Sequence, residues 1–441
     1  MHEERSENDK GVSRRDFVKG SAAVTASLVT VSTLGSRAYA AGSDEIKVGL
    51  IGCGGRGTGA TTQALMATKT PVKLWAMADL FRDELDRSYD MLYNGAEARY
   101  DRVAFDGLKS QMDVPEERRF VGFNAYRQLL DSGVDMVILA CPPAFRPRHF
   151  QAAVEAGKHV FMEKPVAVDP VGVRKVIAAA GAAKRKELSV VAGTQRRHQD
   201  HYIEIMKRIH DGAIGEIRAA QCYWNSSGGS LRENKPAGMS DMEWQVRHWY
   251  YFCWLCGDHI VEQHVHNIDI MNWALRTHPE FVMGMGGRAV REGGNIWDHF
   301  AVEFEYPGDV RVLSMCRHHP RCTNRVSEHI VGTKGIAYID SSTGWIRGEN
   351  PYEPPASPNP YVQEHADLID SIRHGKGLNE GVQVAESTMA AIAGRMSAYT
   401  GRAFKWDWAM KQSKLDLSPA RYEFGDVPVD PIPVPGRTKL I

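Results

Sequence analysis

A short apolar segment followed at once by a glycine-rich turn constrains the fold of this chain more than any other feature. Residues 46–51 (IKVGLI) have the pattern of a buried strand, the turn Gly52-Cys53-Gly54-Gly55-Arg56-Gly57 follows, and small residues then begin a helix. This is the G-x-G-x-x-G pattern in the strand–turn–helix context of dinucleotide-binding domains. Glycine is required because the backbone must turn tightly and approach a pyrophosphate, whose charge the amides and dipole of the helix stabilise. The pattern predicts an α/β fold that begins with a Rossmann domain.

The next strand supports the same prediction and indicates the cofactor. Residues 72–78 form a second apolar run that ends at Asp79, 22 residues after Gly57. An acidic residue at this place accepts hydrogen bonds from the ribose hydroxyls of NAD. A 2′-phosphate would meet like charge there, which favours NAD over NADP, although the nearby Arg82 leaves NADP possible. The polar stretch from residue 82 to 119 resembles an insertion that carries an amphipathic helix.

Length and charge exclude several classes of protein. The chain has 441 residues, which fits two domains, and its 54 Lys and Arg balance 54 Asp and Glu. This balance removes the electrostatic reason to expect a nucleic acid or an anionic membrane as partner. The 43% hydrophobic content is too high for a disordered chain, and seven cysteines are too few for a disulfide scaffold.

The first forty residues have the pattern of an export signal. A twin-arginine motif at residues 13–19 (SRRDFVK) is followed by a weakly apolar stretch at 21–34 and by a small-x-small cleavage site at 38–40 (AYA). We predict that residues 1–40 are removed and that the mature protein is periplasmic or otherwise exported, with no membrane partner. Because the twin-arginine route carries folded proteins, often with a cofactor, we expect the cofactor to be acquired in the cytoplasm.

Further along, a third apolar run at residues 134–139 continues the alternation of strands and helices. A helix is predicted from residue 147 to about 156, because proline stands inside its start and glycine just past its end. The strand predicted at residues 158–162 leads directly into Glu163-Lys164-Pro165.

Taken in order, these motifs resemble the glucose-fructose oxidoreductase/inositol dehydrogenase/MocA (Gfo/Idh/MocA) family. Later segments continue the resemblance: GTQRR at 193–197, GEI at 215–217, EQHVHNID at 262–269 and GTKG at 332–335. The family implies an N-terminal Rossmann domain and a C-terminal α/β domain with an open, mostly antiparallel sheet that often packs in oligomers. We therefore predict domains at residues 41–167 and 168–441, a proline-rich C-terminal arm, and a homo-oligomer.

The resemblance also assigns catalytic roles. Oxidation of a secondary sugar alcohol needs a base for the hydroxyl proton, a hydride acceptor and a positive group near the developing alkoxide. In the family the lysine of EKP lies near the nicotinamide and a substrate hydroxyl, which gives Lys164 the electrostatic role. The signature D-x-G-x-H-x-I-D places the general acid/base on His266, with Glu262 in place of the usual Asp and His264 in place of Gly. On one helix, the i,i+4 spacing would let Glu262 orient or charge-stabilise His266.

Two sets of binding residues follow. The predicted cofactor-binding residues are Gly52, Gly54, Gly57, Arg56, Asp79, Pro142, His149, Glu163 and Lys164. Sugar pockets need flat apolar walls and hydrogen-bond donors, and the predicted substrate-binding residues are Arg196, Arg197, Trp249 and Asn267.

A metal site and a disulfide are the alternatives for the segment around His266. His259, Glu262 and His264 lie close by, but their spacing matches neither HExxH nor a paired CxxC signature, so we expect no metal. Cys253 and Cys256 form a single CxxC. We favour buried free cysteines, and a disulfide remains open because the protein is expected to be exported.

Three functions are compatible with these residues. Free NAD is not expected outside the cytoplasm, so the cofactor must stay bound and return to its starting redox state in each turnover. The first hypothesis is an oxidoreductase that transfers a hydride between tightly bound NAD and a secondary hydroxyl of a sugar, glycoside or polyol. The second is an NAD-dependent glycoside hydrolase that oxidises C3 transiently and eliminates the aglycone. The third, a cofactor-loaded binding protein, is disfavoured because both Lys164 and His266 are present.

Overall fold

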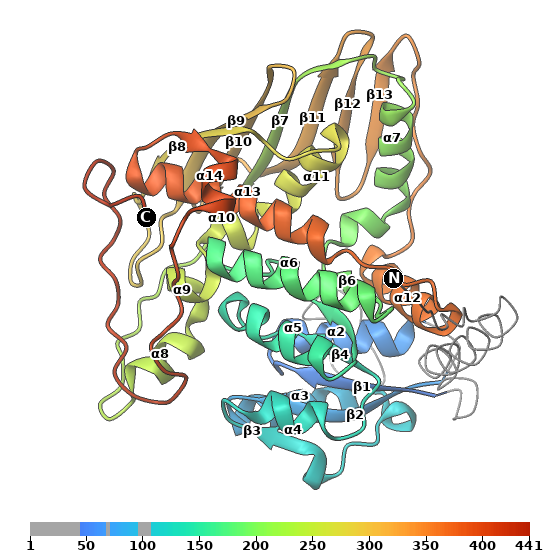
Figure 1. Cartoon of the computed structure of the whole chain (residues 1–441), viewed down its shortest axis with the longest axis vertical. Helices are drawn as coiled ribbons and strands as arrows, with labels where there is room; N and C mark the ends of the chain where they lie inside the picture. The colour runs from blue at the N-terminus through green and yellow to red at the C-terminus, as the bar shows by residue number, and fades with distance from the viewer. Residues whose placement is uncertain (1–44, 68–70, 96–106) are drawn as a thin grey trace, which may run out of the picture. The chain divides into compact units, whose positions relative to one another are not determined.

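The computed structural model describes residues 45–67, 71–95 and 107–441, and residues 46–441 form one structural unit. The predicted export signal at residues 1–40 lies outside the described residues, as does the middle of the predicted insertion at 96–106. Two sheets carry the fold, and Figure 1 shows them at opposite ends of the described unit with helices between them.

The first sheet is parallel throughout and has the strand order β3-β2-β1-β4-β5-β6. Its strands are β1 (Ile46–Ile51), β2 (Val72–Asp79), β3 (Arg119–Val121), β4 (Met136–Leu139), β5 (His159–Met162) and β6 (Val190–Ala192). Strands such as β4 are buried along their whole length because helices cover both faces of the sheet. The order reverses between β1 and β4, and ligands of doubly wound folds bind at such a switch point. The predicted Rossmann domain is confirmed.

The helices of this half are α2 (Gly55–Met66), α3 (Arg82–Asn94), α4 (Ala125–Leu130), α5 (Arg146–Glu155) and α6 (Pro170–Arg185). Short 3-10 turns lie at η2 (Lys109–Gln111), η3 (Glu116–Arg118) and η4 (Pro143–Phe145). The amphipathic helix expected after residue 82 is α3, and the helix expected near residues 147–156 is α5. The first sheet also takes in β6, which lies beyond residue 167, where the sequence suggests a boundary.

The second sheet has the order β13-β12-β11-β7-β10-β9-β8-β14 and is antiparallel except for the β7–β10 pair. Its strands are β7 (Ile217–Ser226), β8 (Phe281–Gly287), β9 (His299–Tyr306), β10 (Val310–His318), β11 (Arg325–Gly332), β12 (Gly335–Asp340), β13 (Gly344–Gly348) and β14 (Phe404–Lys405). Along β9 buried residues alternate with half-exposed ones, because one face packs on helices and the other is open. The predicted open, mostly antiparallel sheet is confirmed.

The remaining elements cover the inner face of this sheet or link the two halves. They are η5 (Gln195–His198), α7 (Asp200–His210), α8 (Asp241–Arg247), η6 (Trp249–Tyr251), α9 (Cys253–Cys256), α10 (His259–Glu262), α11 (Val265–Leu275), α12 (Pro360–His374), α13 (Gly381–Thr400) and α14 (Trp406–Lys411). Helices α11 and α13 pack against strands of the second sheet, whereas α12 returns to pack against α2 and β6 of the first. Among the described residues, no helix is both long and apolar enough to cross a membrane.

The last thirty residues, 412–441, form an arm without helix or strand. Figure 1 shows this arm (dark red) leaving α14 and looping beside α8. Hydrogen bonds fix it there, since the backbone N–H of Met242 donates to Gly425 O at 3.1 Å and Gln245 Nε2 donates to Val427 O at 2.5 Å.

Candidate active site

The glycine-rich turn between β1 and α2 has the backbone geometry that the sequence pattern requires. Gly52 has a φ of +98°, and a Cβ there would lie 2.4 Å from Cys141 N. A Cβ on Gly57 would lie 1.9 Å from Gly52 O, so both positions exclude any larger residue. A Cβ on Gly54 would meet nothing within 4 Å, and no side chain caps α2 at this residue. The turn thus leaves open space beside uncapped helix amides, as a dinucleotide pyrophosphate needs.

A cavity of about 610 Å³ opens beside this turn at the switch point of the first sheet. Its walls include Gly52, Gly54, Arg56, Asp79, Pro142, His149 and Trp249, all predicted from the sequence as binding residues. Arg247 and His248, which lie in the same sequence segment as Trp249, also line it. So do Phe81, Phe123, Phe145 and Val246, which sequence reasoning did not assign. The cavity and the turn together fit the pyrophosphate, ribose and base of a dinucleotide.

Asp79 ends β2 and holds the cavity wall to the glycine-rich turn. Its carboxylate accepts hydrogen bonds from Cys53 N at 2.6 Å and from Phe81 N at 2.9 Å. Burial nevertheless raises the pKa of Asp79 to about 6. Arg82, the residue that left NADP possible, pairs with Asp86 and Glu116 at the surface and is not among the residues that line the cavity.

His149 and Arg56 occupy different places around this cavity. The imidazole of His149 lies with its Nδ1 3.2 Å from Cys141 Sγ, and burial lowers its pKa to about 3, so it is neutral. Arg56 pairs with Glu163 and lies 3.7 Å from Glu364 on α12. The predicted cofactor residue Glu163 is thereby held to the glycine-rich turn, and Glu364 is a member of this cluster that the sequence did not suggest.

Lys164 follows β5 two residues after its last residue, Met162, and the Lys164–Pro165 peptide bond is cis. Its Nζ donates to the backbone oxygen of Glu262 at 2.5 Å and lies 3.3 Å from both carboxylate oxygens of the same residue. Both side chains are about nine-tenths buried. Burial raises the pKa of Glu262, and the neighbouring Lys164 ammonium opposes this shift. Two predicted catalytic residues that are far apart in sequence therefore form one pair.

His266 lies in the first turn of α11, close to this pair. Its ring stacks on Trp224 with 5.8 Å between centroids, and its buried Nδ1 has no hydrogen-bond partner among the described residues. Burial, followed by the charges of Lys164 and Arg196, holds the pKa of His266 well below its ordinary value. The imidazole is therefore neutral and able to accept a proton.

The prediction that Glu262 and His266 share one helix is wrong. Helix α10 ends at Glu262 and α11 begins at Val265, so the chain is interrupted between the two residues. The i,i+4 spacing does not place them on a common helical face, and the carboxylate of Glu262 instead pairs with Lys164. The interruption covers Gln263 and His264, and His264 is the position where the family usually has glycine.

The predicted substrate residues divide into two groups. Arg196 Nη1 pairs with Glu328 Oε1 at 2.6 Å, and Asn267 donates to the same carboxylate oxygen. Arg197 pairs with Asp269 at 2.7 Å. These three residues are engaged in interior contacts, whereas Trp249 lines the cofactor cavity. Glu328, on β11, is far from all of them in sequence, and no local motif indicated it.

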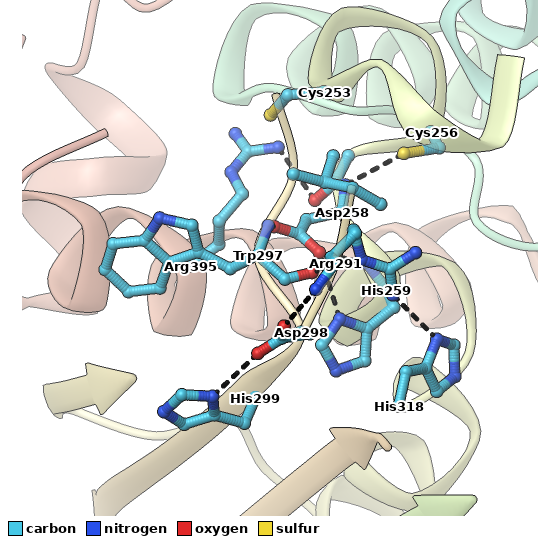
Figure 2. Close-up of polar contacts among 12 residues, drawn as sticks. Cys253, Cys256, Asp258, His259, Arg291, Trp297, Asp298, His299, His318 and Arg395 are labelled. Carbon is cyan, nitrogen blue, oxygen red and sulfur yellow. Dashed lines mark hydrogen bonds and ion pairs between the residues drawn. The ribbon is translucent and has the colours of Figure 1, made fainter. Parts of the chain in front are cut away.

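A buried polar network centred on Asp258 joins α9 and α10 to neighbouring segments (Figure 2). Asp258, at the start of α10, accepts hydrogen bonds from His259 N at 2.6 Å, Trp297 N at 2.7 Å and the hydroxyl of Tyr399. Arg395 Nη1 donates to the neighbouring Gly257 O at 3.0 Å. His259, which the sequence placed among possible metal ligands, instead helps to hold Asp258 in place.

The cysteines next to this network are free thiols. Cys253 and Cys256 are both buried on α9, and burial raises the pKa of each thiol. Cys256 Sγ accepts the backbone N–H of Asp258 at 3.2 Å, which gives it a structural role. The structure therefore agrees with buried free cysteines rather than a disulfide.

Within the described ranges, one group of side chains has ligand atoms at metal-binding separation: Asp298, His299 and His319. The Asp298 carboxylate already accepts the N–H groups of Val290 and Arg291, at 2.7 and 2.9 Å. The rings of His299 and His319 also hydrogen-bond to its Oδ1. These contacts account for the group without an ion, and the absence of a metal stays a prediction.

Comparisons with known proteins agree with the geometry. Residues 46–192 match a family model described as an oxidoreductase family with an NAD-binding Rossmann fold, and residues 202–338 match the model of the GFO/IDH/MocA C-terminal domain. The chain is 23% identical over 263 residues to inositol 2-dehydrogenase of Klebsiella pneumoniae strain 342, covering 58% of this chain and 70% of that protein. It is 25% identical over 251 residues to a glycosyl hydrolase family 109 protein of Streptomyces coelicolor, covering 52% and 47%.

A solved structure is similar over most of the chain. The aldose-aldose oxidoreductase of Caulobacter crescentus, complexed with glycerol, superposes with a TM-score of 0.63 at 19% identity. The superposition covers 82% of this chain and 99% of that one, which shows that the fold is shared.

Proposed function

From the premise that this chain belongs to the Gfo/Idh/MocA family of NAD-binding oxidoreductases, we propose that it transfers a hydride between tightly bound NAD and a secondary hydroxyl of a sugar, glycoside or polyol. The observation that carries the proposal is the buried Lys164–Glu262 pair, whose Lys164 charge also acts on the neutral His266. None of these three residues lines the cavity, but Arg56, which does, pairs with Glu163, the neighbour of Lys164 in sequence. The names of the relatives, inositol 2-dehydrogenase and aldose-aldose oxidoreductase, support this substrate class.

The first step concerns binding. Gly52, Gly54 and Gly57 shape the turn that would receive the pyrophosphate, and Asp79 would accept hydrogen bonds from the adenosine ribose. When bound, the nicotinamide supplies the hydride acceptor. Because Arg82 is paired at the surface with Asp86 and Glu116, the arrangement favours NAD over NADP.

The second step concerns the proton of the substrate hydroxyl. His266 is neutral, and its Nδ1 lacks a partner among the described residues, so the imidazole is placed to take this proton as general base. The Lys164 ammonium stabilises the developing alkoxide, and Glu262 keeps that ammonium in position. The flat ring of Trp224 behind His266 supplies an apolar wall. In the reverse direction the imidazolium returns the proton.

Export of the folded, loaded protein is part of the proposal. The twin-arginine pattern at residues 13–19 would direct the chain out of the cytoplasm and leave a periplasmic or otherwise exported protein. Expression of the full chain and of a variant with both Arg14 and Arg15 changed to Lys tests this. We expect the wild type in the periplasmic fraction and the variant in the cytoplasm. An unchanged distribution would contradict the export proposal.

A second function is supported by the similarity to a glycosyl hydrolase family 109 protein. A redox-neutral hydrolase would oxidise C3 of a glycoside, eliminate the aglycone, add water and reduce the sugar again.

One experiment separates the two functions. The purified protein is offered free sugars, polyols and p-nitrophenyl glycosides, while NADH and nitrophenol are followed together. We expect free sugars or polyols to give NADH without nitrophenol. Nitrophenol without net NADH would make the protein a hydrolase, and neither product over a broad panel would contradict both proposals.

A further inference from the structure

Part of the wall of the cofactor cavity is built from segments that belong to no Rossmann motif. Val246, Arg247, His248 and Trp249, from α8 and η6, line the cavity together with Phe81 and Phe123. Phe81 follows Asp79, the predicted ribose ligand, so this wall lies on the adenosine side of the glycine-rich turn.

An ion pair and a stacked cation join α8 to the Rossmann domain. Arg247 Nη1 pairs with Asp83 of α3 at 3.0 Å, and its guanidinium carbon lies 3.9 Å from the centre of the Phe81 ring. Arg247 Nε also bonds Glu243 at 3.0 Å, which fixes the side chain along its own helix. The cavity wall therefore depends on a contact between two parts of the chain that are 164 residues apart.

The C-terminal arm covers the outside of this wall. The ring of Phe424 packs against Phe81, with centroids 6.0 Å apart, and against Phe123, with centroids 5.2 Å apart. Tyr422 packs in the same way on Phe145, at 5.7 Å, and Phe145 also lines the cavity. Each of the three rings contributed by the Rossmann domain thus has the cavity on one side and the arm on another.

The arm is anchored on both sides of these aromatic contacts. Before them, Leu417 N donates to Asp169 Oδ2 at 2.8 Å. After them, Asn295 Nδ2 donates to Asp430 O at 3.1 Å, and Gly436 N donates to Thr400 O at 3.0 Å. Between the anchors, the arm bonds α8 through Gly425 O and Val427 O. Figure 1 shows the arm passing beside α8 and α9.

We propose that residues 241–251 and the arm segment 417–430 form a clasp that closes over the adenosine end of the dinucleotide and sets the rate at which it leaves. The proposal rests on the proposed function, because it takes the cavity to hold NAD. For adenosine to leave through this wall, the Arg247–Asp83 pair and the packing of Phe424 on Phe81 and Phe123 must be disrupted. An exported enzyme with no external supply of NAD would need such slow release.

The test is the rate of nucleotide release from the full mature chain. The protein is loaded with NADH and diluted into excess NAD⁺, and the fall in bound NADH fluorescence is followed. Phe424→Ala removes the aromatic contacts to both cavity rings, and we expect release about tenfold faster. Ile432→Ala is the matched control, because Ile432 lies on the same arm and is as exposed as Phe424 (44% against 49%) but falls outside the segment 417–430, and this variant should release NADH at the wild-type rate.

A second measurement uses the wild-type chain alone. Hydrogen exchange at residues 240–249 and 420–427 should slow when NADH binds, because the clasp then packs on the ligand. Unchanged hydrogen exchange, or release of NADH from Phe424→Ala at the wild-type rate, would overturn the clasp proposal. Neither result would contradict NAD binding itself. A wild-type chain that binds no NADH would overturn the proposed function and the clasp with it.

Discussion

The two halves of the candidate site differ in how they are encoded. The cofactor half is formed by short local motifs, since Gly52, Gly57 and Asp79 all follow strands of one sheet and meet because those strands are neighbours. The catalytic half joins residues from distant parts of the chain, such as Lys164 after β5 and Glu262 at the end of α10. Local backbone geometry therefore shapes the first half, and long-range pairing of buried charges shapes the second.

The strongest test of the catalytic half is the loss of its proton acceptor. His266→Ala should lower turnover by roughly 10²–10⁴-fold, the usual contribution of a positioned acid/base group, while NADH binding persists. Steady-state kinetics and fluorescence titration measure the two effects separately. His374→Ala, which changes an exposed histidine on α12, is the control. Wild-type turnover from His266→Ala would remove it from the mechanism.

The buried Arg196–Glu328 pair should show that long-range pairing stabilises the second domain. Glu328→Gln leaves the Arg196 charge uncompensated in the interior, so the free energy of unfolding should fall by about 3 kcal/mol. Urea denaturation measures this. Glu204→Gln, which breaks an exposed pair with Arg208, should change stability by no more than about 0.5 kcal/mol. Equal effects of the two changes would show that the buried pair stabilises the second domain no more than an exposed pair does.

The pH dependence of NAD affinity tests the role of Asp79 in the cofactor half. Burial raises its pKa to about 6, so the carboxylate is ionised above that pH and accepts hydrogen bonds from the ribose hydroxyls. NAD affinity should therefore weaken as the pH falls through about 6. Asp79→Asn should weaken binding by about tenfold at neutral pH and remove this pH dependence. Calorimetric titration across the pH range measures both, and an unchanged profile in the variant would assign the dependence to another group.

Arg82 gives the smallest expected effect. Its guanidinium pairs with Asp86 and Glu116 at the surface, and Arg82 is not among the cavity-lining residues. Arg82→Ala should change the affinity for NAD and for NADP by less than about twofold, since exposed ion pairs contribute little. A selective loss of NADP binding would show instead that Arg82 turns toward a 2′-phosphate.

The contrast also explains what the sequence could predict. The order of strands and glycine turns predicted the α/β fold, and the family resemblance predicted the open sheet and named the candidate catalytic residues. The interruption of the helix at Gln263 and His264 was missed, because i,i+4 spacing does not reveal a break. Glu328, Glu364 and Phe424 were missed because each meets the site through tertiary packing, which a single sequence does not display.

The central claim is that this chain carries NAD, that a sugar or polyol reduces the bound NAD, and that His266 takes the proton of the substrate hydroxyl. The protein is purified without added nucleotide, one portion is denatured to identify what it releases, and the rest receives a substrate from the panel. We predict that NAD(H) is released on denaturation, that the bound cofactor is reduced in the wild type, and that His266→Ala holds the same nucleotide but leaves it oxidised. An empty protein, or equal reduction in the variant, would contradict the account.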